Sequence, residues 1–183
     1  MQGYGLAQGD GFVPQMQAWL DDRGVAVTLI NAGVSGDTTT GALARLDWAL
    51  AEDPGALIIS LGGNDILRAI DPGFARENLA AILRRAQALE LPVLLVGINV
   101  PPNYGAAYQA AFQAIYPELS AEFDTLYYPD FLQALLDLEG RSKTFLRYFQ
   151  TDGLHPNPDG VAIIVEAMGP TVAQLVRRAK RQN

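Results

Sequence analysis

Short apolar runs alternate with longer amphipathic segments along this chain, and this alternation constrains its fold more than any other feature. Leu57–Leu61 and Pro92–Ile98 are near-continuous apolar runs, and the first is followed by Gly62-Gly63. Such runs are typical of parallel strands buried on both faces of a sheet. Val25–Ile30 and Leu126–Tyr128 are shorter runs of the same kind. Four strands that alternate with helices predict an α/β fold with a parallel sheet.

Helices are predicted around these strands, because apolar residues recur there at helical spacing. Asp71-Pro72 opens one of them with a capping residue and a proline in the first turn. Gly169-Pro170 lies inside the last one and predicts a kink. The chain is expected to form a single domain over residues 1–183. The expected helices span residues 12–23, 38–52, 71–89, 106–123, 131–138 and 158–180.

Composition excludes several classes of partner and site. The net charge of −7 argues against nucleic acid, since little here would neutralise a phosphate backbone. The absence of cysteine excludes disulfides, thiolate metal sites and a cysteine nucleophile. No uninterrupted apolar run reaches about 18 residues, so no membrane span is expected. Met1–Gly5 has neither the basic start nor the apolar stretch of a secretory signal.

Three polar segments are expected at the carboxyl ends of strands, where ligands bind in sheets of this kind. They are Asn31–Thr38, Gly62–Asp65 and Asp152–Asn157. The last contains His155, the only histidine of the chain. Asp152, three residues earlier, can bond one ring nitrogen and leave the other as a general base. The alternatives are a surface histidine beside a helix-capping aspartate, or a divalent-metal site that also uses Asp159.

Gly36 and Asn64 supply candidate hydrogen-bond donors in the other two segments. Gly36 has no side chain and precedes a helix, so its backbone N–H can approach a substrate oxygen. Asn64 offers a side-chain amide just past a strand. Together they are able to stabilise the negative charge that develops during acyl transfer, as an oxyanion hole. Taken singly, Gly36 is interpreted as a turn residue and Asn64 as a residue that forms an Asx-turn.

In this order, the three segments closely resemble the SGNH/GDSL hydrolases. The likeness is to the bacterial acyl-CoA thioesterases, lysophospholipases and arylesterases, and it extends from Gly3 to the last helix. The resemblance implies a flavodoxin-like, three-layer α/β/α fold and acyl transfer to water through an acyl-serine, without a cofactor or metal. It implies that Gly36 and Asn64 form the oxyanion hole, and that Asp152 and His155 are the catalytic acid and base.

One family motif has no match in the sequence. The resemblance implies an apolar strand followed by Gly-Asp-Ser-Leu, with the nucleophilic serine a few residues before Gly3. Ser35 and Ser60 are near other motifs, but the family uses neither as nucleophile. We therefore expect these 183 residues to be inactive or very weakly active, because of a truncated or late start. The alternative hypothesis is a pseudoenzyme that binds an acyl chain or carbohydrate.

The unmatched strand also affects the sheet. In the flavodoxin order the first strand lies between its neighbours. Without it, Val25–Ile30 borders a gap with unpaired backbone groups. The sequence therefore predicts instability, self-association through this gap, or occupation of the gap by another segment.

Substrate-binding residues are predicted after two strands. Asn103 and Tyr104 lie in a Pro- and Gly-containing loop, where the family has a substrate loop. Asp65, Ile66 and Leu67 follow Asn64 and offer further lining. These residues are equally compatible with ordinary core or loop positions. The expected substrates are small-molecule esters and thioesters with short to medium acyl chains.

Two further points remain open from the sequence. Gly33–Gly41 is rich in Gly and Thr, as phosphate sites are, but it lacks the lysine and spacing of nucleotide-binding motifs. A nucleotide or flavin binder is therefore a minor alternative. Relatives of the subgroup are often exported to the periplasm, and the sequence leaves the compartment undetermined.

Overall fold

The computed structural model describes residues 3–138 and 140–181, which fall into two compact units. The first unit is built from residues 1–35 and 132–174, and the second from residues 36–131 and 175–183. The prediction of a single domain over residues 1–183 stays a prediction. Each unit is described by itself below.

A parallel sheet organises the second unit. Its strands are β1 (Leu57–Ile59), β2 (Val93–Val96) and β3 (Leu126–Tyr128), in the order β1-β2-β3. Leu57 pairs with Val93, and Leu94 pairs with Leu126, in parallel register throughout. β2 is buried at every position, as the sequence of this central strand predicts. The predicted α/β class with a parallel sheet is therefore confirmed.

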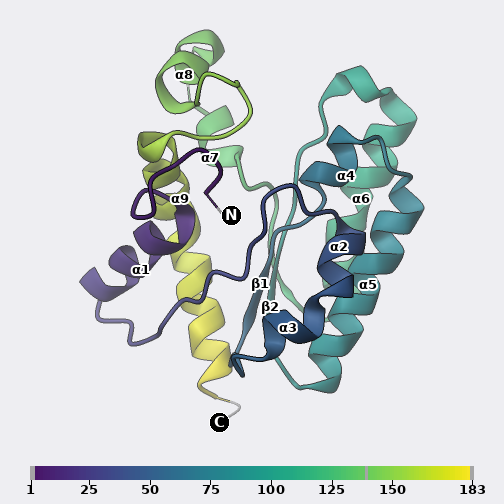
Figure 1. Cartoon of the computed structure of the whole chain (residues 1–183), viewed down its shortest axis with the longest axis vertical. Helices are drawn as coiled ribbons and strands as arrows, with labels where there is room; N and C mark the ends of the chain where they lie inside the picture. The colour runs from purple at the N-terminus through teal and green to yellow at the C-terminus, as the bar shows by residue number, and fades with distance from the viewer. Residues whose placement is uncertain (1–2, 139, 182–183) are drawn as a thin grey trace. The chain divides into compact units, whose positions relative to one another are not determined.

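Helices of the second unit lie mainly on one side of these strands, as Figure 1 shows for α2, α5 and α6. Asp71 caps α5 by accepting a hydrogen bond from the N–H of Gly73, as expected from Asp71-Pro72. The predicted helix over residues 38–52 is divided at Arg45 into two short helices. A short helix after β1, α4, was not predicted. The helices are α2 (Thr39–Ala44), α3 (Leu46–Leu50), α4 (Gly63–Leu67), α5 (Pro72–Ala88) and α6 (Ala106–Glu122), with a 3₁₀ turn at Pro102–Tyr104.

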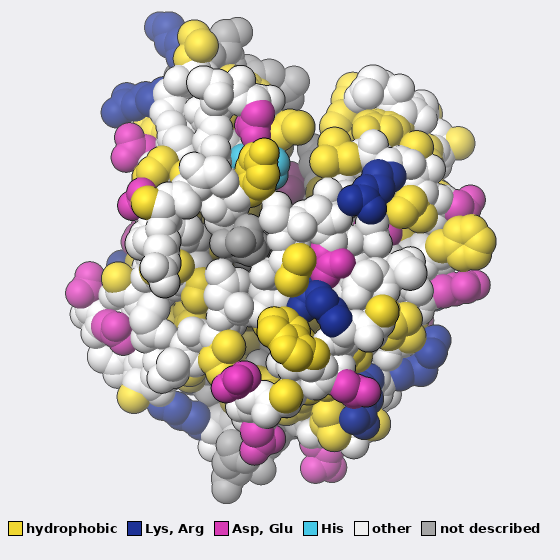
Figure 2. Space-filling model, in the orientation of Figure 1, with side chains coloured by type: hydrophobic (Ala, Val, Ile, Leu, Met, Phe, Trp, Pro, Cys, Tyr) yellow, Lys and Arg dark blue, Asp and Glu magenta, His cyan; other side chains and the backbone are white. Residues whose placement is uncertain are grey.

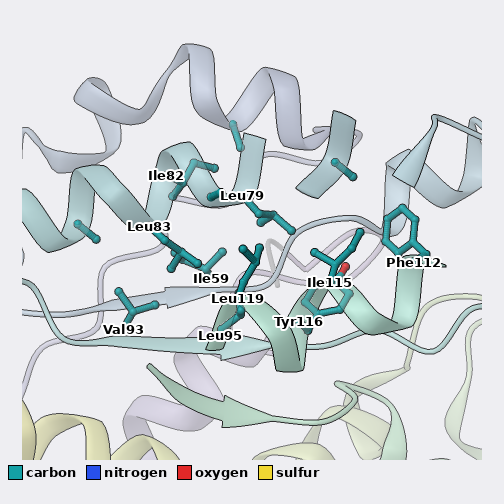
Figure 3. Close-up of a cluster of buried hydrophobic side chains, with 14 of the residues drawn as sticks. Ile59, Leu79, Ile82, Leu83, Val93, Leu95, Phe112, Ile115, Tyr116 and Leu119 are labelled. Atoms are coloured by element: carbon teal, nitrogen blue, oxygen red, sulfur yellow. The ribbon is translucent and has the colours of Figure 1, made fainter. Parts of the chain in front are cut away.

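The core of the second unit lies between the sheet and helices α5 and α6. Figure 3 shows Leu79 and Leu83 of α5 pointing toward Ile59 and Leu95 of the strands. Side chains of α6 complete the cluster from beside them, and Leu119 is fully buried. The apolar faces predicted from helical spacing therefore pack on the sheet and shield it from solvent on this side.

The first unit is helical. Its helices are α1 (Phe12–Asp22), α7 (Gln133–Leu136), α8 (Arg141–Tyr148) and α9 (Pro158–Ala179), whose last residues belong to the second unit. α8 was not predicted. α9 continues through Gly169-Pro170, and a side chain at Gly169 would collide with the ring of Trp19. Gly169 is therefore a packing residue for α1.

α9 is also long and apolar enough to cross a membrane, although no uninterrupted apolar run within it reaches about 18 residues. Its most apolar stretch has a mean hydropathy of 1.3, and 56% of that stretch is buried inside the protein. The core helix of a folded protein can have the same length and composition, so this helix by itself does not indicate a membrane span.

The predicted strand over Val25–Ile30 is wrong in this structure. Within the described residues it pairs with no strand, although its burial still alternates between half-buried and exposed positions. Strands need a neighbour for their hydrogen bonds. Here the side chain of Gln17 makes two of the hydrogen bonds that a neighbouring strand would make. Its amide donates to the carbonyl of Val27 at 2.9 Å and accepts from the N–H of Leu29 at 2.8 Å.

Replacing Leu79 by alanine should lower the free energy of unfolding by about 2–5 kcal/mol, because it leaves a cavity where a 0% exposed side chain packs. The matched control is Leu146→Ala on α8, where the side chain is 88% exposed and the expected change is below about 0.5 kcal/mol. Urea denaturation followed by circular dichroism measures both. Equal losses in the two variants would contradict the position of the core.

Candidate active site

His155 and Asp152 form a hydrogen-bonded pair in the loop before α9. The Nδ1 atom of His155 lies 2.7 Å from Oδ2 of Asp152. A carboxylate only accepts, so Nδ1 carries the proton of this bond. In the part of the chain that the structure describes, Nε2 has no hydrogen-bond partner, and the side chain is 43% exposed. The predicted pairing therefore forms, and it leaves Nε2 without a partner among the described residues.

The backbone of this loop holds the pair in place. The other carboxylate oxygen of Asp152 accepts the N–H groups of Leu154 at 2.9 Å and His155 at 3.0 Å. The carbonyl of His155 accepts the N–H of Gln150 at 2.8 Å. Phe149 and Pro156 form an antiparallel bridge, which closes the loop into a compact turn.

These contacts change the acidity of Asp152. The hydrogen bond from the His155 ring, followed by those from the His155 and Leu154 backbones, lowers the pKa of Asp152 from 3.8 to about 2. The carboxylate therefore stays ionised far below neutral pH and keeps the imidazole in one orientation.

Gly36 lies in the second unit, in the turn before α2. Its φ of +80° is in the left-handed region, which explains why glycine is needed there. Its carbonyl accepts from Nη2 of Arg68 at 2.9 Å. Among the described residues, its N–H donates to no protein acceptor and is exposed. This N–H is therefore available to an oxygen of a bound molecule.

Asn64 follows β1 in the first turn of α4, where backbone N–H groups are free. The preceding Gly62 has a φ of +114°, and a side chain there would collide with the hydroxyl of Tyr116. Asn64 is half-buried, and its side-chain amide has no partner among the described residues. Like the N–H of Gly36, this amide is available to a ligand.

A buried bond holds the segments of Gly36 and Asn64 together. Asp65 is 0% exposed, and its carboxylate accepts the N–H of Thr39 at 2.9 Å and the hydroxyl of Thr39 at 2.6 Å. Asn78 of α5 donates to the same hydroxyl at 3.1 Å. Asp65 thus joins the first turn of α4 to the first turn of α2 from inside the unit.

The predicted substrate loop is attached to α6 by a series of aromatic rings. Tyr104 stacks on Tyr108 at 5.5 Å, and Tyr108 stacks on Phe112 at 5.8 Å. The hydroxyl of Tyr108 donates to the carbonyl of Ile70 at 2.9 Å. Burial raises the pKa of Tyr108, so this hydroxyl stays a donor. The half-buried ring of Tyr104 is thereby fixed at the end of the series.

The structure distributes the predicted site residues over both units. His155 and Asp152 lie together in the first unit, and Gly36 and Asn64 lie on connected segments of the second. Among the predicted substrate residues, Leu67 and Asn103 are exposed, Tyr104 is half-buried, and Asp65 and Ile66 are buried.

The contributions of Thr39 and Arg68 to this region were not predicted. For Thr39 the sequence contains no signal beyond its place in a run of threonines. Arg68 stands four residues after Asn64, one helical turn away, which is the spacing that places both on one side of a helix.

The lowered pKa of Asp152 leads to a prediction about acid pH. Its ionisation should have a midpoint near pH 2, so the stability that the His155 contact contributes is complete above about pH 4 and is lost as the pH falls toward 2. The carboxyl carbon resonance of Asp152, followed by NMR, measures the midpoint. In His155→Ala the midpoint should move up toward 3.8. An unshifted midpoint in the native chain would refute the pairing.

Comparison with known proteins identifies the family. The model of the GDSL-like lipase/acylhydrolase family matches residues 1–163. Esterase TesA of Pseudomonas aeruginosa is 38% identical over 173 residues, which cover 94% of this chain and 83% of that protein. The thioesterase 1/protease 1/lysophospholipase L1 of Escherichia coli is 37% identical, over 87% of this chain and 74% of that protein.

Solved structures agree with these relatives. The psychrotrophic esterase EstA from Pseudoalteromonas sp., inhibited by monoethylphosphonate, superposes with a TM-score of 0.84 at 33% identity. That match covers 96% of this chain and 92% of EstA. AlinE4, an SGNH-hydrolase family esterase, superposes with a TM-score of 0.75 at 39% identity, over 94% of this chain and 89% of AlinE4. The predicted flavodoxin-like α/β class is thus confirmed. The chain belongs to the GDSL-like lipase/acylhydrolase family, in the subgroup that includes TesA, and is a carboxylic ester hydrolase.

Proposed function

We propose that this protein hydrolyses carboxylic esters and thioesters through an acyl-serine intermediate, with His155 as general base and Asp152 as its orienting partner. The 2.7 Å bond between Nδ1 of His155 and Asp152 carries this proposal. It fixes the tautomer in which Nε2 has a lone pair, and this nitrogen is open to accept a proton.

The proposed reaction has two steps. Nε2 of His155 takes the proton of a serine hydroxyl while the serine oxygen attacks the acyl carbonyl, and the imidazolium then protonates the departing alcohol or thiol. Water next attacks the acyl-serine with His155 again as base, and the acid leaves as the serine regains its proton. In both steps the N–H of Gly36 and the amide of Asn64 donate to the oxyanion, which supports the charge that develops there.

The nucleophile in this proposal is the serine of a Gly-Asp-Ser-Leu block that precedes Gly3. Ser35 and Ser60 lie in other segments, and within the described residues neither hydroxyl is hydrogen-bonded to His155, which would have to activate it. We propose that the 183-residue chain is inactive or weakly active without such a block.

A paired assay of p-nitrophenyl butyrate hydrolysis tests this function. The 183-residue chain is compared with the same chain extended upstream by an apolar strand and Gly-Asp-Ser-Leu-Thr. Only the extended chain should turn over. His155→Ala and Asp152→Asn in it should lower kcat by about 10³-fold or more, since the base is lost or left in the wrong tautomer.

Each outcome of the assay is informative. Fast hydrolysis by the chain without the extension would overturn the proposed nucleophile and direct attention to Ser35 or Ser60. If both chains fold and neither hydrolyses the ester, the acyl- or carbohydrate-binding pseudoenzyme becomes the better description. Ligand-dependent shifts in Tm would then identify what it binds.

For the substrate we propose short to medium acyl chains, bound near Leu67, Asn103 and Tyr104. The exposure of Leu67 and Asn103 and the fixed ring of Tyr104 support this assignment. Asp65 and Ile66 are buried, so we propose that they act by supporting this region from inside the unit. Among the described residues, Val25–Ile30 pairs with no strand, which supports a proposed site of self-association there.

Tyr104→Ala in the extended chain should change the preference for acyl-chain length, since it removes the ring at the end of the aromatic series. Tyr104→Phe keeps the stacking and should keep the native preference. The ratio of kcat/KM across p-nitrophenyl esters from acetate to dodecanoate measures the effect. An unchanged ratio in Tyr104→Ala would remove this loop from the substrate site.

A further inference from the structure

Gln150 donates three hydrogen bonds around His155. Its backbone N–H donates to the carbonyl of His155 at 2.8 Å. Its side-chain amide donates to the carbonyl of Pro156 at 3.0 Å and to the carbonyl of Tyr4 at 2.8 Å. One half-buried side chain therefore connects the loop of the proposed base to a segment almost 150 residues earlier in the chain.

The segment that contains Tyr4 is shaped to receive this amide. Gly5 has a φ of +73°, and a side chain at this position would collide with Oε1 of Gln150. Glycine thus serves two needs here: it adopts the left-handed backbone, and it allows the amide to lie directly against the chain.

The ring of Tyr4 lies against the imidazole of His155. The ring centroids are 4.8 Å apart with an angle of 38° between the planes. Figure 2 shows the imidazole, the one side chain drawn in cyan, with hydrophobic side chains beside it at the surface. Tyr4 itself is 55% exposed, so little apolar burial holds its ring there. Its position must depend mainly on how its backbone is fixed.

We propose that Gln150 is a positioning residue that holds the Tyr4 ring against His155, and that this ring stabilises the imidazolium formed during hydrolysis. An aromatic ring close to a cation is attractive, more so where water is partly excluded. The stabilisation of the imidazolium rests on the proposed function. The arrangement of the three side chains does not depend on it and is testable without any turnover.

NMR on the 183-residue chain tests the arrangement, because His155 is the only histidine and gives a single pair of ring C–H signals. The Tyr4 ring should displace these signals through its ring current. Tyr4→Leu should abolish the displacement, and Tyr4→Phe should keep it. Gln150→Ala and Gln150→Glu should abolish it although Tyr4 is present, since both remove the amide donor.

Gln15→Ala is the matched control. The Gln15 amide also bridges two backbone carbonyls, those of Asp10 at 2.8 Å and Pro158 at 3.1 Å, but it has no bond to the His155 loop. It should leave the histidine signals unchanged. The double variant Tyr4→Leu/Gln150→Glu should give the same histidine signals as each single variant, because both substitutions remove one and the same contact. A native signal in Gln150→Glu, or additive effects in the double variant, would overturn the proposal.

Kinetics in the extended chain test the effect on the imidazolium. Tyr4→Leu and Gln150→Glu should each lower kcat about 5- to 30-fold, the factor that a cation–π contact of about 1–2 kcal/mol supplies, and leave KM nearly unchanged. A change in KM alone would show that Tyr4 contacts substrate instead. If the extended chain shows no hydrolysis, the proposed function fails, while the NMR result still decides whether Gln150 positions Tyr4.

Discussion

The buried carboxylate of Asp65 is the interaction on which the second unit depends. A fully buried carboxylate is costly unless its oxygens are bonded, and here both oxygens accept from Thr39. Because Thr39 begins α2 and Asp65 lies in α4, this contact fixes the two turns that present the N–H of Gly36 and the amide of Asn64. Arg68 supports the same arrangement from the surface through the carbonyl of Gly36.

In the first unit, mostly local hydrogen bonds orient the ring of His155. Asp152 and His155 are three residues apart, and the backbone between them bonds the same carboxylate that orients the ring. Local bonds alone leave both faces of the imidazole open. The long-range contact through Gln150 adds the ring of Tyr4 on one side, so the environment of this histidine depends on a segment far away in sequence.

The successes and failures of sequence-based prediction have a common physical origin. β2 and α5 were predicted because their apolar pattern and caps are local signals. Val25–Ile30 has the pattern of a strand, but a strand forms only where a neighbouring strand accepts and donates its hydrogen bonds. Here the side chain of Gln17 makes two of those bonds instead. Helix α8 was missed because it has only 8 residues and because its N-cap residue, Gly140, offers no capping side chain that would mark its start in the sequence.

The sequence by itself determined the α/β class, the family, and the pairing of Asp152 with His155, since each depends on periodicity or short spacing. The tertiary structure alone decided that Asp65 faces inward to Thr39, that Arg68 holds Gly36, and that Tyr4 lies on His155. The reason is physical: these contacts join residues between about 26 and 151 positions apart, and no local pattern encodes which distant groups meet once the chain has packed.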